Sequence, residues 1–364
     1  MKTTLQKHWL TCSVAATALV LTGCHSIGPG SVPRDRSDYG SSIGDSWKRQ
    51  TLLNIVKLRY MDQPTFVDVG QIVAGYQLQM GASIGAGWAS DSSVTPNRSL
   101  TLGGAGTYID RPTITYVPLT GNKFLRGLMT PLPPESVFFT IQSGWPADGV
   151  LFATVASING LKNQGTSISG VTAPDPNFLR ALQLLRKIQL SDAVAMRIKK
   201  DAQQQQTTII TFRSKDVSPE TLADVHELRR LLRLNPDAEE LKLVFAGNSV
   251  NSDEIAILTR SLLQQIGTMA SQVEVPAEDV AQGRASPGWE TIASNTNAVR
   301  LIQIHCAKSK PSDAFVTVPY RDHWFWIDDR DMKSKRVFSF MMMLFTLADT
   351  GEKENLPLIT IPAQ

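Results

Sequence analysis

Three aspartates, Asp328, Asp329 and Asp331, stand close together near the C-terminal end of the sequence. Carboxylate oxygens are preferred ligands of divalent cations, so these residues are weak candidates for a metal site. Their spacing is not that of an EF-hand loop, because no glycine permits the turn and no glutamate closes it. We favour another interpretation, in which the aspartates cap the helix that follows. The sequence therefore predicts no metal site.

A second polar group surrounds Gly144 and includes Ser143 and Asp148. A serine nucleophile on a sharp turn needs the pattern G-x-S-x-G, which is missing here, and no histidine lies nearby in the sequence. The chain also lacks a CxxC pair, an HExxH motif and a glycine-rich phosphate loop after a strand. We expect a corner between two helices with Trp145 as a wedge, no cofactor and no enzymatic activity.

The clearest chemical signal is the run Leu21-Thr22-Gly23-Cys24. It follows a short basic start and an apolar stretch over residues 9–21, which is the layout of a secretory signal and too short to span a bilayer. A cysteine directly after Leu-Thr-Gly resembles the lipobox of bacterial lipoproteins. In that motif the thiol is acylated, and the cysteine becomes the mature N-terminus. The alternative is an ordinary signal peptide with an incidental cysteine. We predict a signal peptide over residues 1–23 and palmitate on Cys24.

The residue after the lipobox cysteine indicates whether a lipoprotein stays in the inner membrane or moves to the outer membrane. His25 stands where an aspartate would resemble an inner-membrane retention signal, so we expect anchoring to the outer membrane, mainly on its periplasmic side. Removing residues 1–23 leaves 34 of the 36 basic residues against 33 acidic ones, a formal charge of +1. This balance does not favour nucleic acid as a partner. Cys306 then has no intramolecular disulfide partner, and we expect it to pack as a small apolar residue.

Residues 76–109 follow a period of two. Apolar residues alternate with glutamine, serine and glycine over 76–88, and a looser alternation over 99–109 follows a polar loop. This pattern predicts a long, glycine-rich, amphipathic β-hairpin. Its possible membrane-facing or oligomer-forming residues are Tyr76, Leu78, Met80, Ile84, Trp88, Leu102 and Tyr108.

Two interpretations of this hairpin stay open. It could lie over a soluble core with its glutamine and serine face in water, which we favour. Alternatively, it could enter a membrane, because a transmembrane strand needs about 9–11 alternating residues with aromatics at the interfaces. One hairpin cannot close a barrel, so insertion would require several copies that each donate strands.

The remaining pattern predicts an α+β protein with mixed or antiparallel sheets covered by helices. We expect a flexible tether over 24–42, an N-terminal region over 43–162, a loop over 163–175 and a C-terminal α+β domain over 176–364. The expected helices are 43–60, 121–129, 134–143, 147–160, 176–188, one from Ser218, 252–272 and 334–348. The expected strands are 112–117, 193–199, 206–213, 241–245, 299–306, 314–319, 323–328 and 358–361.

Several strings of the mature chain resemble a family of uncharacterised lipoproteins of Gram-negative bacteria. They are Asp45–Gln50, Leu53–Tyr60, Arg111–Tyr116, Gln142–Asp148, Ser157–Leu161 and Trp324–Asp331. The resemblance covers most of the mature chain and implies a lipoprotein of the outer membrane. It implies no activity, substrate or catalytic residue.

These observations lead to three functional hypotheses. We expect a non-enzymatic structural or interaction component of the cell envelope, which binds a protein partner or its own copies. An alternative is a subunit of an oligomeric outer-membrane pore or export channel that donates hairpin 76–109. A further alternative is an envelope hydrolase acting on peptidoglycan or lipid, with Asp148, Asp328, Asp329 or Asp331 as acids or metal ligands.

Overall fold

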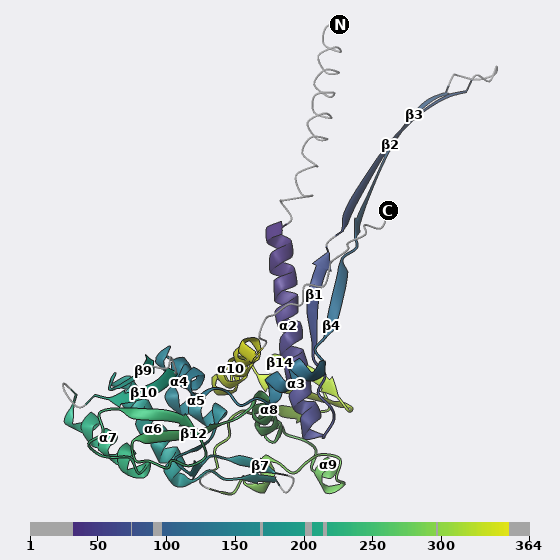
Figure 1. Ribbon diagram of the computed structural model, residues 1–364. Coiled ribbons are helices and arrows are strands. Elements are labelled where there is room, and N and C mark those ends of the chain that lie inside the picture. The colour runs from purple at the N-terminus through teal and green to yellow at the C-terminus, as the bar shows by residue number, and fades with distance from the viewer. Residues whose placement is uncertain are drawn as a thin grey trace. The chain divides into compact units, whose positions relative to one another are not determined.

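Figure 1 shows the computed structural model, which describes residues 32–73, 75–89, 97–167, 170–200, 206–213, 217–295 and 298–348. The chain divides into two compact units. Unit 1 comprises residues 1–46 and 67–119, and unit 2 comprises residues 47–66 and 120–364. Helices combine with mixed and antiparallel open sheets, so the α+β prediction is confirmed.

Unit 1 contains a narrow two-stranded ribbon. Strand β1 (Val67–Val73) pairs antiparallel with β4 (Thr113–Pro118), and β2 (Tyr76–Ala89) pairs antiparallel with β3 (Asn97–Asp110). The backbone N–H of Arg111 donates to the carbonyl of Gly75 at 2.9 Å and joins the two ladders. Figure 1 shows them as successive parts of one twisted ribbon. The predicted hairpin is therefore confirmed, and it is longer than the alternation alone indicated.

Helix α2 (Val32–Arg59) supplies residues to both units. It begins well before residue 43, so the tether expected over 24–42 is wrong from Val32 onward. Pro33 suits the first turn of a helix, where a backbone N–H has no helical partner, and Asp35 complements the positive end of the helix dipole. Residues 24–31 of the expected tether lie outside the described residues.

Unit 2 is built on a six-stranded sheet with the order β6-β5-β12-β11-β10-β9. Only β11 and β12 run parallel; the other neighbours are antiparallel. Helix α4 (Pro134–Gln142) contacts three of these strands, and α6 (Pro176–Leu190) packs on α7 (Pro219–Leu231). The strands are β5 (Val155–Ile158), β6 (Leu161–Lys162), β9 (Val194–Lys200), β10 (Gln206–Phe212), β11 (Leu241–Phe245) and β12 (Glu254–Thr259).

A three-stranded antiparallel sheet completes unit 2, in the order β13 (His305–Ala307), β15 (His323–Asp328), β14 (Ala314–Tyr320). The buried core includes Phe178, Ile210 and Leu228 beside the larger sheet, and Phe325 and Phe338 beside the smaller one. The other elements are α3 (Gly121–Met129), α5 (Ala147–Thr154), β7 (Gly165–Ser167), β8 (Gly170–Thr172), α8 (Leu262–Ala270), α9 (Ala277–Ala281), the 3-10 helix η1 (Trp289–Thr291) and α10 (Met332–Ala348).

Two predicted helices are partly strands. The helix expected over 147–160 ends at Thr154, and the Asn159-Gly160 turn joins β5 to β6. The helix expected over 252–272 is β12 followed by α8. A continuous apolar run such as Ile255–Ile257 suits a central strand as well as a buried helix. In this position it lies between β5 and β11, where both neighbours satisfy its backbone.

Two other expectations also differ from the fold. Strand β5 pairs with β12, so one sheet takes strands from both sides of the boundary expected at 163–175. The strand expected over 299–306 is shorter and consists of β13 alone. In the residues before β13, backbone N–H groups bond to side chains instead of to a neighbouring strand. Gln272 Oε1 accepts from the N–H groups of Leu301 and Ile302 at 2.6 and 3.0 Å. The strand expected over 358–361 lies outside the described residues.

Candidate functional site

The β2–β3 ribbon has two chemically different faces. Odd-numbered positions pair with odd-numbered positions throughout the ladder. They place exposed small or polar residues on one face: Gln77, Gln79, Gly81, Ser83 and Gly85 from β2, and Thr101, Gly103, Ala105 and Thr107 from β3. Ile109, opposite Gln77, is the apolar, half-buried exception at the near end. The even-numbered register pairs include Leu78 with Tyr108, Met80 with Gly106, Ile84 with Leu102 and Trp88 with Arg98. The amphipathic pattern is thus retained in the paired hairpin.

Both edges of this ribbon are open in the described part of the chain, where β2 and β3 pair only with each other. Every residue of β4 is exposed, and Tyr116 retains 62% of its accessible surface. An isolated two-stranded ribbon is marginal in water, and an open edge is a template for another strand. The ribbon therefore has the properties of an assembly element.

An aromatic pair lies at the end of β2–β3 nearest β1 and β4. The rings of Tyr76 and Tyr108 stack with centroids 6.3 Å apart and planes inclined by 20°. Arg34 in helix α2 lies within hydrogen-bond reach of this pair. Hydrogen bonding and charge attraction from Asp35 raise the pKa of Arg34, and hydrogen bonds with Tyr76 and Tyr108 add to the shift. This cluster links helix and ribbon within unit 1.

The aspartates at 328–331 are engaged in local structure. Asp331 accepts from the backbone N–H of Ser334 at 3.0 Å and caps α10, as the sequence indicates. Burial alone would raise its pKa, but hydrogen bonds from the Ser334 side chain and backbone outweigh this and lower the pKa. Asp328 accepts from the N–H of Arg330 at 2.8 Å, and Asp329 pairs with Lys335 at 2.7 Å. Among the described residues, no group of three or more potential ligands could hold a metal ion.

The Gln142–Asp148 segment forms a corner that Gln189 holds together. The Gln189 amide donates to the carbonyls of Ile141 and Trp145 at 2.8 and 2.7 Å, and it accepts from the N–H of Ala147 at 3.0 Å. Trp145 packs against Phe340 with ring centroids 5.0 Å apart, as a wedge should.

The two residues of this corner that a hydrolase would use have other partners. Ser143 donates to the carbonyl of Phe139 at 2.9 Å. Asp148 is half-exposed and lies 4.0 Å from Arg186. Among the described residues no histidine pairs with Ser143 or Asp148, so the corner fits a structural role.

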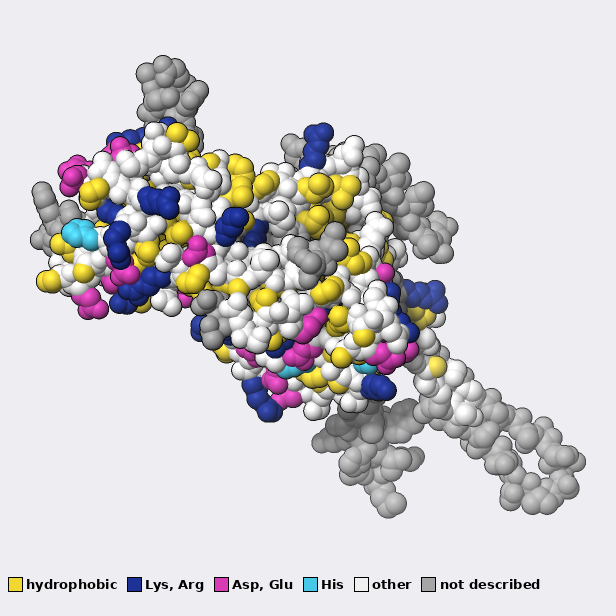
Figure 2. Space-filling model, turned by 90° about the horizontal axis from the view of Figure 1, so that it is seen from below, with side chains coloured by type: hydrophobic (Ala, Val, Ile, Leu, Met, Phe, Trp, Pro, Cys, Tyr) yellow, Lys and Arg dark blue, Asp and Glu magenta, His cyan; other side chains and the backbone are white. Residues whose placement is uncertain are grey.

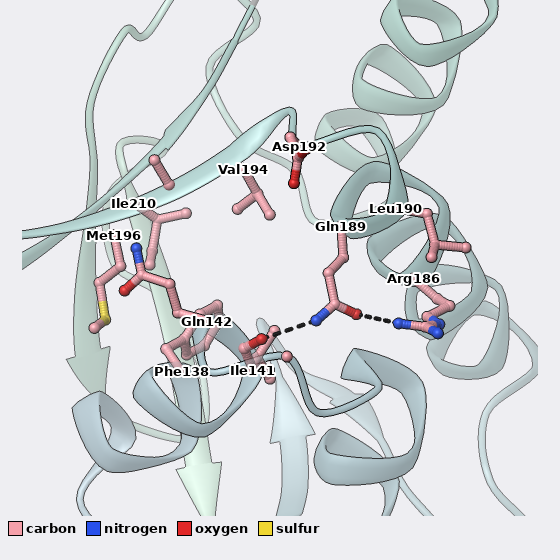
Figure 3. Close-up of a pocket in the computed structure, with 12 residues that line it drawn as sticks. Phe138, Ile141, Gln142, Arg186, Gln189, Leu190, Asp192, Val194, Met196 and Ile210 are labelled. Atoms are coloured by element: carbon pink, nitrogen blue, oxygen red, sulfur yellow. Dashed lines mark hydrogen bonds between the residues drawn. The ribbon is translucent and has the colours of Figure 1, made fainter.

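A cavity of about 320 Å³ opens beside this corner. Figure 3 shows Phe138, Ile141 and Gln142 of α4, Val194 and Met196 of β9, and Gln189 of α6 around it. Its charged lining residues are Arg186 and Asp192, and Gln189 has all its polar atoms bonded. The lining brings together no nucleophile and base, so we assign it no chemistry.

Cys306 lies in β13 opposite Phe325 and is partly buried. Burial, with smaller contributions from the charges of Glu274 and Asp279, raises the pKa of its thiol to about 11. A raised pKa keeps the thiol protonated and unreactive at neutral pH. This supports the apolar packing role expected from the sequence.

We expect Cys306 to react slowly with a maleimide at pH 8. A shift from about 9 to about 11 leaves roughly 100-fold fewer thiolates at that pH, so the native rate should be about 100-fold below the rate in urea. The native rate should then increase up to about pH 11. Peptide mass spectrometry of the labelled protein measures this. Equal native and unfolded rates would contradict the assignment.

Sequence reasoning missed the ion pair between the buried Arg59 and the half-exposed Glu290. The Arg59 side chain is 1% exposed, and its Nη2 donates to both Glu290 oxygens at 2.8 and 2.9 Å. A Cβ on Gly288 would lie 1.9 Å from the Arg59 guanidinium, so only glycine fits there. The Leu53–Tyr60 segment, which contains Arg59, is therefore held in place by a contact within unit 2. The partners are 231 residues apart in the chain, and no local pattern reveals them.

Arg260 is a second buried cation that the sequence did not reveal. It donates to the carbonyls of Phe152 and Ala153 near the end of α5 at 3.2 and 3.4 Å, and to the carbonyl of Gln164. Burial lowers its pKa to about 10. Carbonyls at a helix C-terminus carry partial negative charge, which explains how the guanidinium is tolerated there.

The predicted lipidation site, Cys24, and the predicted signal peptide over residues 1–23 lie outside the described residues. Within the part of the chain that is described, no helix has the length and hydrophobicity to cross a membrane. Figure 2 shows basic and acidic side chains interspersed on one face of the molecule, without a large field of one sign. No protein-family model, curated protein or solved structure matches this chain.

Proposed function

We propose that this chain is a lipoprotein held in the outer membrane by a lipid on Cys24, mainly on the periplasmic side. In this proposal it acts without enzymatic chemistry, as a structural or interaction component of the cell envelope. The lipobox supports the anchor. The open-edged ribbon carries the interaction role, because strands from a protein partner or from other copies would satisfy its edges.

The anchor predicts a single site of palmitate labelling. Cells that express the wild-type chain should incorporate labelled palmitate, and Cys24→Ala should reduce the label to background. Cys306→Ala is the matched control, because it removes the other cysteine of the mature chain and should leave the label unchanged. Equal labelling of wild type and Cys24→Ala would remove the basis of the proposal.

The dimensions of β2 and β3 favour a second candidate function, a subunit of an oligomeric outer-membrane pore or export channel. Each strand has 14 residues in one uninterrupted ladder, which exceeds the 9–11 or so that a tilted transmembrane strand needs. Several copies would be required to close a barrel. Size measurement of the full-length protein in mild detergent tests this, because a pore needs a discrete oligomer and a monomer would exclude it.

The aspartates that an envelope hydrolase would use each have a local partner, as described above. No observation on the described residues favours that alternative.

A further inference from the structure

Formal charges in β2 and β3 occur only at the two ends of the ladder. The strands contain one basic residue, Arg98, and one acidic residue, Asp110. The register pairs Arg98 with Trp88 near the far end and Asp110 with Tyr76 at the near end. Between them, 11 consecutive pairs from Gln77–Ile109 to Gly87–Ser99 carry no charge. This distribution suits a segment whose two ends lie in polar surroundings and whose middle lies in an apolar one.

The aromatic positions enclose the same zone. Tyr76 and Trp88 are 12 positions apart on β2. At about 3.3 Å per residue this is about 40 Å along the strand. A strand tilted by about 45° would rise roughly 28 Å over that length, close to the ~25 Å apolar band between the aromatic girdles of outer-membrane barrels. The uncharged zone therefore has the height of a bilayer.

The odd-numbered face offers the complementary surface. Its described residues from Gln77 to Thr107 are exposed and consist of glutamine, serine, threonine, glycine and alanine, and Ile109 at the near end is the one large apolar residue among them. The Ser83 hydroxyl donates a hydrogen bond to the carbonyl of Gly103 across the ladder at 3.4 Å. A water-filled lumen tolerates such a face, and the apolar even-numbered positions suit lipid.

We propose that copies of this chain enclose a water-filled lumen lined by the odd-numbered face of β2 and β3, and that this lumen does not discriminate between small cations and anions. The inference rests on the second candidate function above. The occupant of each open edge is a second copy, with β2 of one chain pairing with β3 of the next. Closure satisfies every edge N–H and C=O group, as a bilayer requires.

The absence of selectivity follows from the lining. Ion channels obtain selectivity from rings of charged side chains or of coordinating carbonyls. In a closed ring, each residue of the odd-numbered face becomes a ring of identical residues, and none of these rings is charged. Size, rather than charge, would then limit passage.

Conductance measurements test the proposal. Full-length lipidated protein is added to planar bilayers of phosphatidylethanolamine and phosphatidylglycerol under a KCl gradient, and the reversal potential gives the permeability ratio of K⁺ to Cl⁻. We expect a ratio near unity for the wild type. Ser83→Asp should make the channel several-fold cation-selective, because it adds a ring of carboxylates. Ser83→Asn, which is neutral and of similar size, should not.

Each outcome decides a separate point. A strongly selective wild-type channel would overturn this inference and leave the pore itself standing. An unchanged ratio in Ser83→Asp, and in Gln79→Glu as a second lumen position, would overturn the assignment of the odd-numbered face. No conductance from a wild-type preparation that forms a discrete oligomer would overturn both the inference and the pore, while palmitate labelling would still report on the anchor.

Discussion

Replacing Ile84 by lysine is expected to destabilise the membrane-assembled protein by about 2–4 kcal/mol, whereas lysine at Ser83 should be tolerated. The two positions are adjacent in β2 and lie on opposite faces of the ribbon. Ile84 pairs with Leu102 two positions from the middle of the uncharged zone, so its lysine would have to enter the hydrocarbon. A lysine at Ser83 would enter water.

The measurement is the urea concentration at which the oligomer dissociates in lipid vesicles, compared for the two variants and the wild type. A difference of 2–4 kcal/mol corresponds to a change of roughly 30-fold to 1,000-fold in the equilibrium constant, so the expected contrast is large. If the ribbon instead covers a protein surface with its polar face in water, lysine at Ile84 would be buried against protein, and the same contrast would appear in urea unfolding of the lipid-free protein. A contrast that requires vesicles therefore supports insertion, and equal effects of the two lysines in vesicles would exclude it.

The ribbon could be predicted because its signal is local. Strict alternation over 76–88 sets the face of every residue, and a polar loop fixes where the chain turns. The exact register, in which Tyr76 pairs with Asp110 and Trp88 with Arg98, was not predicted, because the expected loop over 89–98 includes Arg98 and residue 97, which belong to the ladder. Its continuation into β1 and β4 was harder to foresee, since β1 is interrupted by a register shift at Gly70 and ends at Val73, before β2 begins at Tyr76.

Helix-start signals gave mixed results for a physical reason. Ser218 before Pro219 does cap α7, and its Oγ accepts from the N–H of Thr221 at 3.1 Å. The similar signal at Ser252 fails, because Glu254 begins a strand. The real cap is Ser261, which forms a reciprocal capping box with Gln264. Capping is worth about 1 kcal/mol, which is less than the burial gained by placing β12 inside the sheet.

The buried charges could not be predicted, since they depend on distant partners. Arg59 and Glu290 meet only after the chain has folded, and Arg260 is held by carbonyls rather than by a carboxylate. The candidate functional surface was recognised from sequence because it lies in one hairpin. A functional site formed by residues from several elements of unit 2 could not be recognised from local sequence patterns.

The Asn159-Gly160 turn was missed although its signal is local. Two residues with positive φ, 44° and 82°, join β5 to β6, and Asn-Gly is the preferred sequence for such a hairpin turn. The apolar run before it suggested a continuing helix. The turn lies within Ser157–Leu161, one of the strings on which the family resemblance was based, and its side-chain contacts give that string a structural role.

Asn159→Ala is expected to lower the free energy of unfolding of unit 2 by about 2–5 kcal/mol. Asn159 Nδ2 donates to the carbonyl of Leu232 at 2.7 Å, and Oδ1 accepts from the N–H of Ala256 at 2.6 Å. Ala256 is fully buried in β12, so its N–H would lose this partner where water cannot replace it. Alanine also resists a positive φ, which adds about 1 kcal/mol.

Two matched variants separate these contributions in urea unfolding followed by tryptophan fluorescence. Asn159→Gly removes the same hydrogen bonds but accepts the positive φ, so it should recover about 1 kcal/mol relative to alanine. Asn159→Asp keeps the acceptor for Ala256 but sets a carboxylate oxygen against the carbonyls of Leu232 and Glu254, so it should be less stable than the wild type. If alanine and glycine both unfold within 0.5 kcal/mol or so of the wild type, the turn is not the junction between β5, β12 and α7 that its contacts indicate.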